Sequence, residues 1–136
     1  MIKPIMKSEF FLRLPSEDAG PDDAATGQDL LDTLHEHDRE CVGLAANMIG
    51  VRKRIICVKD GNRTLLMYNP QILEQVNAYQ TSEGCLSLIG ERPCTRYRRI
   101  KVEYLDENFV HRIKNFSGYT AEIIQHEIDH CCGIVI

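Results

Sequence analysis

The last helical segment of the sequence carries residue types that could bind a metal ion. His126, Glu127 and His130 form an H-E-x-x-H pattern. Positions i and i+4 lie about 40° apart on one face of a helix, so both histidines could hold one ion with the glutamate beside them. The alternative is a pair of core or capping histidines at a polar helix end, because this short pattern can also occur by chance.

A catalytic metal usually has a third protein ligand, and the sequence offers few places for it. One class of zinc hydrolases reads H-E-x-x-H-x-x-G-x-x-H. The chain matches this pattern as far as Gly133 but has Ile136 in place of the last histidine. The third ligand must then lie upstream, or be Cys131 or Cys132. Cys131 is a poor candidate, because it is rotated about 100° from His130 around the helix.

Cys85 is the upstream candidate. It lies between Gly84 and Gly90, and glycines allow close approach of the backbone to a ligand. A thiolate suits zinc or ferrous iron. The other readings are a buried structural cysteine or a free nucleophile. A cysteine protease that uses Cys85 with His126 would leave His130 without a role.

The elements that position these residues are expected to be two helices separated by short strands. The leucines after Asp23 predict a helix from about Ala24 to Glu40. A second helix is expected from about Thr120, with Ile124, Ile128 and Cys131 on its core face. Runs rich in β-branched and aromatic residues predict four strands. These runs are Ile55–Val58, Leu65–Pro70, Ile100–Leu105 and Val110–Phe116. This order predicts an α+β fold.

Composition excludes several classes of protein. The chain has 136 residues, 43% of them hydrophobic, with a formal net charge of −4, so we expect one domain and no DNA partner. A basic cluster at Arg96, Arg98, Arg99 and Lys101 is interpreted as the solvated part of a strand entry, with a phosphate or RNA contact as the alternative. No run approaches the ~18–20 apolar residues of a membrane span, and no signal peptide is evident. We therefore expect no membrane association, and six reduced cysteines in a cytoplasmic protein.

Three segments resemble the signatures of the peptide deformylase family, G-x-G-L-A-A-x-Q, E-G-C-L-S and H-E-x-D-H. The chain has CVGLAANMIG at 41–50, EGCLS at 83–87 and HEIDH at 126–130, in the family's order. The resemblance covers about Leu30 to Ile134. It implies a peptide-deformylase-like α+β fold, with antiparallel strands around a central helix that carries HEIDH. It also implies one such metallohydrolase domain over residues 1–136.

The resemblance implies a ligand set and a reaction. Cys85, His126 and His130 would bind one divalent transition metal, with Fe²⁺ as the native ion and Zn²⁺, Ni²⁺ or Co²⁺ replacing it in preparations. Glu127 would act as general base and then general acid. The substrate would be the N-formyl-methionyl end of a new bacterial polypeptide, which yields formate and a free amino terminus. The backbone N–H of Leu86 would donate to the oxyanion.

Two positions depart from the family pattern. Met48 stands where the family has a glutamine that also donates to the oxyanion, and a thioether donates nothing. Losing one such donor typically costs about 10²–10³ in rate, so we expect reduced activity. Cys41 replaces the first glycine of the same motif, and its side chain is expected to shift the strand that holds the substrate backbone. The alternatives are an amidase acting on another N-acyl substrate, or a catalytically impaired metal-containing protein that binds nascent chains or the ribosome.

Further positions are assigned to the substrate pocket by the resemblance. Val42, Gly43, Glu83 and Gly84 correspond to residues that hold the substrate backbone or line the pocket. Arg92 matches an arginine that lines the methionine side-chain pocket, with a surface salt bridge as the alternative.

Asp129 is expected behind the metal ligands, with Arg96 as its ion-pair partner, because outer partners orient metal ligands. The expected binding partners are formyl-methionyl peptides or nascent chains. Transient ribosome contact is also considered. Family members often continue beyond the second helix, so any ribosome contact made by such a tail is expected to be missing after Ile136.

Overall fold

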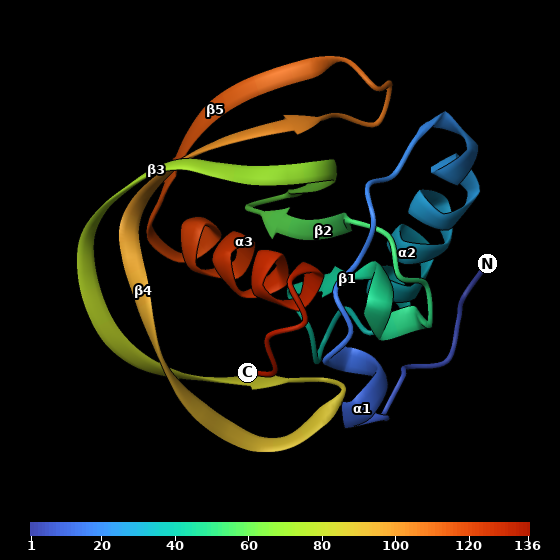
Figure 1. Ribbon diagram of the computed structural model, residues 1–136, viewed down its shortest axis with the longest axis horizontal. Helices are drawn as coiled ribbons and strands as arrows, with labels where there is room; N and C mark the ends of the chain where they lie inside the picture. Colours follow the sequence, from blue (N-terminus) through green and yellow to red (C-terminus); the bar gives the residue numbers. More distant parts are fainter.

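A five-stranded antiparallel sheet wraps around one central helix in the computed structural model, which describes residues 1–136 (Figure 1). The strands lie in chain order, β1-β2-β3-β4-β5. They are β1 (Gly43–Ala45), β2 (Ile55–Asp60), β3 (Arg63–Cys85), β4 (Leu88–Leu105) and β5 (His111–Ser117). The helices are α1 (Glu9–Leu12), α2 (Ala24–Glu36) and α3 (Gly118–Cys131), with 3₁₀ turns η1 (Pro21–Asp23) and η2 (Ala46–Ile49).

The long hairpin of β3 and β4 curves around α3 (Figure 1). The pairing register shifts between Tyr68 and Gln71 and again between Ile72 and Glu74. Such bulges bend a strand and increase its twist. The curvature brings the tip of the hairpin, where β3 ends at Cys85, back to α3.

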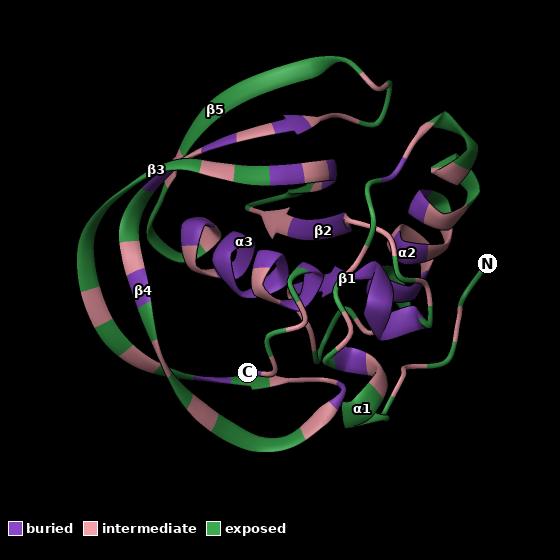
Figure 2. Ribbon diagram, viewed as in Figure 1, coloured by how far each residue is buried: buried purple, intermediate pink, exposed green.

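Helix α3 is buried along most of its length (Figure 2). Ile124 is fully buried and Ile128 nearly so, and the helix packs against β1, β2 and β4. It ends before Gly133, whose φ of 76° lies in the left-handed region. A Cβ at Gly133 would lie 2.4 Å from the Arg13 carbonyl oxygen, so glycine is required both for the turn and for this close approach.

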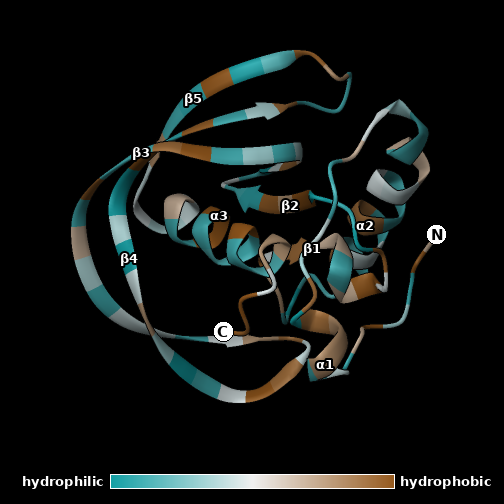
Figure 3. Cartoon of the chain, viewed as in Figure 1, coloured by the Kyte–Doolittle hydropathy of each residue, from teal (hydrophilic) through white to brown (hydrophobic).

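The apolar core extends from α3 across β2 to Leu30 and Leu34 of α2, while the outer part of the β3–β4 hairpin is mostly hydrophilic (Figure 3). Ile55, Ile56, Cys57 and Val58 of β2 are all 0% exposed. None of the helices is both long and apolar enough to cross a membrane.

The α+β order is confirmed, and the second helix begins at Gly118, close to the expected start. Other expectations were wrong in extent. The first helix ends at Glu36, because His37 has non-helical backbone angles and its N–H bonds back to carbonyls of the last turn. The strands expected at 65–70 and 100–105 are the inner ends of the much longer β3 and β4. The short helix α1 lies in a region expected to be irregular.

The interpretation of the basic cluster as solvated is wrong for one residue. Arg98 and Arg99 are exposed, but Arg96 is only 4% exposed. Arg96 lies where α3 covers β4, and its guanidinium bonds to Asp129 of that helix. Its charge is neutralised there by two carboxylates, described below.

Candidate active site

Three potential metal ligands converge where the tip of the hairpin meets α3. Cys85 Sγ lies 3.4 Å from His130 Nε2, and the Nε2 atoms of His130 and His126 lie 3.2 Å apart. The three ligand atoms are all within 4.8 Å of one another. Ligand atoms around a tetrahedral ion with bonds of ~2.0–2.3 Å are separated by roughly 3.3–3.6 Å. The Cys85–His130 and His130–His126 distances are both close to these values. One thiolate with two imidazoles suits zinc or ferrous iron. These residues therefore fit a single transition-metal ion.

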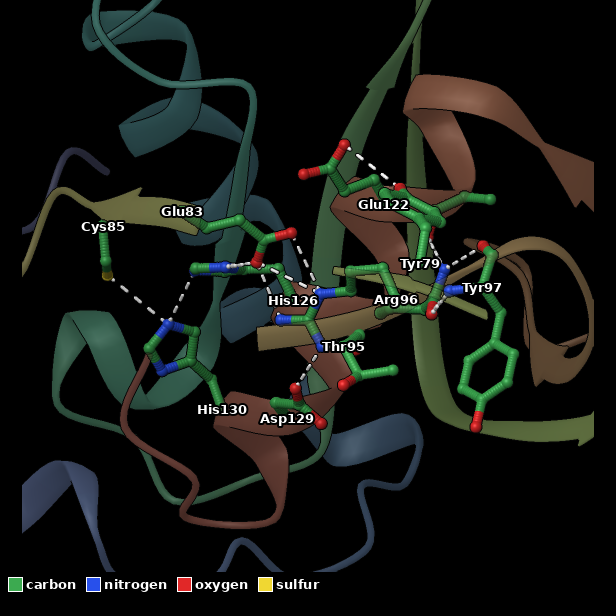
Figure 4. Close-up of polar contacts among 12 residues, drawn as sticks. Tyr79, Glu83, Cys85, Thr95, Arg96, Tyr97, Glu122, His126, Asp129 and His130 are labelled. Carbon is green, nitrogen blue, oxygen red and sulfur yellow. Dashed lines mark hydrogen bonds and ion pairs between the residues drawn. The ribbon is translucent and has the colours of Figure 1, made fainter. Parts of the chain in front are cut away.

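A buried ion-pair network holds this group in place (Figure 4). His126 Nδ1 donates to Glu83 at 2.7 Å, which leaves Nε2 to face the ligand cluster. The Arg96 guanidinium donates through Nε and Nη2 to Glu83, at 2.7 Å for the shortest contact, and through Nη1 to Asp129 at 2.6 Å. The expected ion pair between Arg96 and Asp129 is thus present. Partners of this kind fix the orientation of a ligating histidine.

The network shifts the protonation of its members. Burial opposes the charge on Glu83, but the bonds from His126 and Arg96 prevail and hold the pKa of its carboxyl well below the usual range. Burial would lower the pKa of His126, yet the neighbouring Cys85 and Glu83 raise it to about 10. Burial and the charge of His126 lower the pKa of His130 to about 3. The His130 ring is therefore neutral, as a metal ligand must be.

Glu127 lies beside the ligands, in contact with β1. A Cβ at Gly43 would lie 3.0 Å from Glu127 Oε2 and 2.7 Å from the Ile123 side chain, so glycine is needed for this close packing. Glu127 is 4% exposed and its Oε1 has no hydrogen-bond partner. Burial raises the pKa of Glu127 to about 7, against the attraction of the His126 charge. A carboxyl with a pKa near neutrality can both accept and release a proton.

A cavity of about 620 Å³ opens over these residues. Val42, Gly43 and Met48 line it from the first motif, and Glu83, Gly84, Cys85 and Leu86 line it from the end of β3. His126 and Glu127 line it from α3. Nearly all the residues assigned to metal, catalysis and substrate thus surround one space. His130, Asp129 and Arg96 lie behind it.

Arg92 is placed differently from the pocket role that the sequence implies. It does not line the cavity; its Nη2 lies 3.6 Å from Glu9 of α1, and its Nη1 is buried without a partner. A role for Arg92 in the methionine pocket stays a prediction.

The two departures from the family pattern lie at the wall of the cavity. Met48 is 1% exposed, and its sulfur accepts from the backbone N–H of Ala45 at 3.5 Å. The half-buried Cys41 thiol donates to the carbonyl of Gly43 at 2.9 Å. Burial, followed by the charge of Glu127, raises the pKa of Cys41 to about 12, so this thiol stays protonated. β1 keeps a regular register with β2 next to Cys41.

Several lining residues were not identified from the sequence. Tyr119, Glu122 and Ile123 precede His126 by one or two helical turns on the same face of α3. Helical periodicity counted back from the HEIDH motif would have found them. The loop before Cys41 also contributes to the rim, with Asp38, Arg39 and Glu40. No sequence signal marks these loop residues.

The helix-borne H-E-x-x-H group, the converging thiol and the cavity define a metal-dependent hydrolase. The model of the polypeptide deformylase family matches residues 6–136 of the chain. A peptide deformylase of Clostridium beijerinckii is 52% identical over 136 residues, which is 100% of both chains.

Two crystal structures of class I type b peptide deformylase from Acinetobacter baumannii are also similar. The actinonin-bound structure has a TM-score of 0.88 at 30% identity, covering 99% of this chain and 95% of that one. The Met-Ala-Ser-bound structure has a TM-score of 0.87 at 30% identity, covering 99% and 97%. The chain belongs to the polypeptide deformylase family. It is an enzyme with the fold of that family, and the comparisons do not favour a different amidase or a non-catalytic binding protein.

Proposed function

We propose that the chain removes the formyl group from the N-terminal formyl-methionine of nascent polypeptides, as one metallohydrolase domain of 136 residues acting in the cytoplasm. The observation that carries the proposal is the convergence of Cys85, His126 and His130 beside Glu127 in one cavity. The reaction consumes one water, breaks the bond between the formyl carbon and the methionine nitrogen, and yields formate and a free amine.

Cys85, His126 and His130 would hold the metal, and Fe²⁺ is the ion we propose for the native enzyme. A bound divalent ion supplies Lewis-acid activation of water and of the formyl carbonyl. The protein's contribution is to present the Cys85 thiolate and the two imidazoles, and His126 would release its extra proton when the metal binds. Glu83 orients His126, and Arg96 in turn holds Glu83.

Glu127 would move the proton. Its carboxylate accepts the proton from the attacking water and delivers it to the methionine nitrogen as the carbon–nitrogen bond breaks. Burial favours the protonated form of this carboxyl, which helps it to hold the proton between the two steps. The backbone N–H of Leu86, at the cavity wall, would donate to the oxyanion that develops on the formyl oxygen.

The free edge of β1 would hold the peptide backbone. The Val42 carbonyl accepts a hydrogen bond from the backbone N–H of Lys59, at the start of the pairing between β1 and β2. Successive residues of an edge strand direct their N–H and C=O groups to opposite sides, so those of Gly43 point away from β2, to the unpaired edge. Gly84 lines the other side of the cavity. An extended peptide between Gly43 and Gly84 would add a strand at this edge, a common mode of peptide recognition.

The test is release of formate from formyl-Met-Ala-Ser by anaerobically purified protein, with acetyl-Met-Ala-Ser as the comparison substrate. We expect formate release and no hydrolysis of the acetyl peptide. Cleavage of the acetyl peptide alone would favour an amidase of different specificity. Absence of hydrolysis of both peptides by metal-loaded protein would contradict the proposal.

Two cysteine variants test the ligand set. Cys85→Ala should lose both the metal and formate release. Cys132→Ala is the matched control, because Cys132 is an exposed residue at the end of α3. It should keep one metal per chain and the parent rate. An unchanged metal content in Cys85→Ala would remove Cys85 from the site.

A further inference from the structure

The turn that carries the Leu86 amide lies outside the strand ladder. Leu86 and Ser87 connect β3 to β4, and Cys85 pairs with Leu88 across the turn. The Leu86 carbonyl accepts no backbone hydrogen bond. In this sequence Met48 cannot donate to an oxyanion, so the orientation of the Leu86 amide matters more than it would with two donors.

A side chain from the N-terminal segment bonds to this turn. The Lys7 ammonium donates to the Leu86 carbonyl oxygen at 2.7 Å, across 79 residues of sequence. The preceding residue, Met6, donates its backbone N–H to the carbonyl of Met48, also at 2.7 Å. Met6 and Lys7 are therefore bonded to Met48 and Leu86, the two positions that the resemblance assigns to the oxyanion site.

A third contact ties the same segment to the other arm of the hairpin. Glu9 Oε1 lies 3.6 Å from Arg92 Nη2 on β4. Figure 1 shows α1, which begins at Glu9, beside the tip of the β3–β4 hairpin. Residues 6–9, here called the N-terminal strap, thus connect η2 to the Leu86–Ser87 turn and to β4.

We propose that Lys7 is a positioning residue for the oxyanion donor. By holding the Leu86 carbonyl, it fixes the Leu86–Ser87 turn so that the Leu86 N–H points into the cavity, while Met6 anchors the strap to η2. The inference rests on the proposed deformylase function. It adds to the reaction a residue of the N-terminal segment that acts through the Leu86–Ser87 turn, without contact to the substrate.

Three variants test this role, with kcat and KM for formyl-Met-Ala-Ser as the measurements. Lys7→Met should lower kcat about five- to tenfold at unchanged KM and metal content, a fraction of the loss of a whole donor. Lys7→Arg keeps a donor and should stay within about twofold of the parent. Lys3→Met is the control, because Lys3 lies in the same segment but faces Asp29 of α2. It should have the parent kcat.

Coupling to Met48 sharpens the test. In a Met48→Gln background a second oxyanion donor is available, so Lys7→Met should lower kcat less than it does in the parent. An equal loss in both backgrounds would overturn the proposal. So would an equal loss in Lys3→Met, an effect on KM alone, or full kcat in Lys7→Met.

Amide hydrogen exchange gives a readout that does not depend on activity. Exchange in the segment 84–88 should be faster in Lys7→Met than in the parent or in Lys3→Met. If the parent protein released no formate, the proposed function would fail, and exchange alone would decide whether Lys7 orders the turn. Unchanged exchange in Lys7→Met would overturn the positioning role.

Discussion

The two walls of the cavity differ in how closely they keep the family pattern. On the α3 side, both histidines and Glu127 match the family motif, and Arg96 bonds to both Glu83 and Asp129 within hydrogen-bond distance. On the β1–η2 side, two family residues are replaced, by Cys41 and Met48. Metal binding and proton transfer are thus separable from oxyanion stabilisation and backbone recognition. We expect this enzyme to keep the first pair of properties and to be altered in the second.

Replacing Glu127 on the α3 side of the cavity should lower the rate more than any other change. Glu127→Gln keeps the shape of the side chain but cannot accept a proton at neutral pH. We expect kcat for formate release to fall by about 10²–10⁴, with metal content unchanged. Formate assays and metal analysis on the same preparation check this. A rate near that of the parent would remove Glu127 from the mechanism.

Breaking the network behind the ligands should cost stability. Arg96→Met leaves the buried carboxylate of Glu83 without its main cation, and the loss of one partner of a buried pair costs about 3–5 kcal/mol. The midpoint and slope of urea unfolding measure the change. Arg98→Met is the control, since Arg98 is an exposed β4 residue that stacks on Tyr79 at 4.7 Å. Equal losses in both variants would contradict a special role for the buried network.

Repairing the altered wall should raise the rate. In Met48→Gln, the amide oxygen can take over the bond from the Ala45 N–H while the amide nitrogen donates to the oxyanion. We expect kcat to rise at least about tenfold, because the new bond forms chiefly in the transition state. Met48→Leu offers no donor and should show no gain. A flat or lower kcat in folded, metal-loaded Met48→Gln would mean that the wall is adapted to methionine.

The smallest effect is expected at Cys41. Its thiol occupies one acceptor position of the Gly43 carbonyl at the free edge of β1. Cys41→Gly releases this carbonyl for a peptide, and KM should fall about threefold with kcat unchanged, in line with the net value of one hydrogen bond. Cys41→Ser keeps a donor and should resemble the parent. A rise in KM on Cys41→Gly would indicate that the thiol helps to hold the peptide.

Helix α3, whose apolar residues recur at helical spacing, was predicted well from the sequence. The full extent of the β3–β4 hairpin was not. Helix α3 shows its core face through Ile124, Ile128 and Cys131, all of them buried. β3 and β4 continue far beyond their apolar ends, and residues 73–78 of β3 are exposed on both faces, so they show no buried alternate positions. Bulges also break the alternation of side chains in β3, so period-two reasoning stopped near Pro70.

The site shows a similar division. The HEIDH spacing alone indicates a metal-binding helix face, but Cys85 was assigned through resemblance to the family, because the fold brings it to the helix from far away in sequence. Lys7 could not have been foreseen, since a lysine in an irregular segment carries no periodicity. The burial of Arg96 also depends on the tertiary structure, because α3 covers a face of β4 that reads as solvated in the sequence.

The curved hairpin has a consequence for the order in which the enzyme assembles. Cys85 and His130 are separated by 45 residues and meet only after the hairpin has closed over the last helix. Closing so long a loop costs chain entropy before any contact is made, and sheets with distant pairings fold slowly. We therefore expect the metal site to form late in folding, and an ion bound there would stabilise the hairpin by linking its tip to α3. Metal-free protein should open first at this hairpin, which makes it the expected point of proteolytic attack.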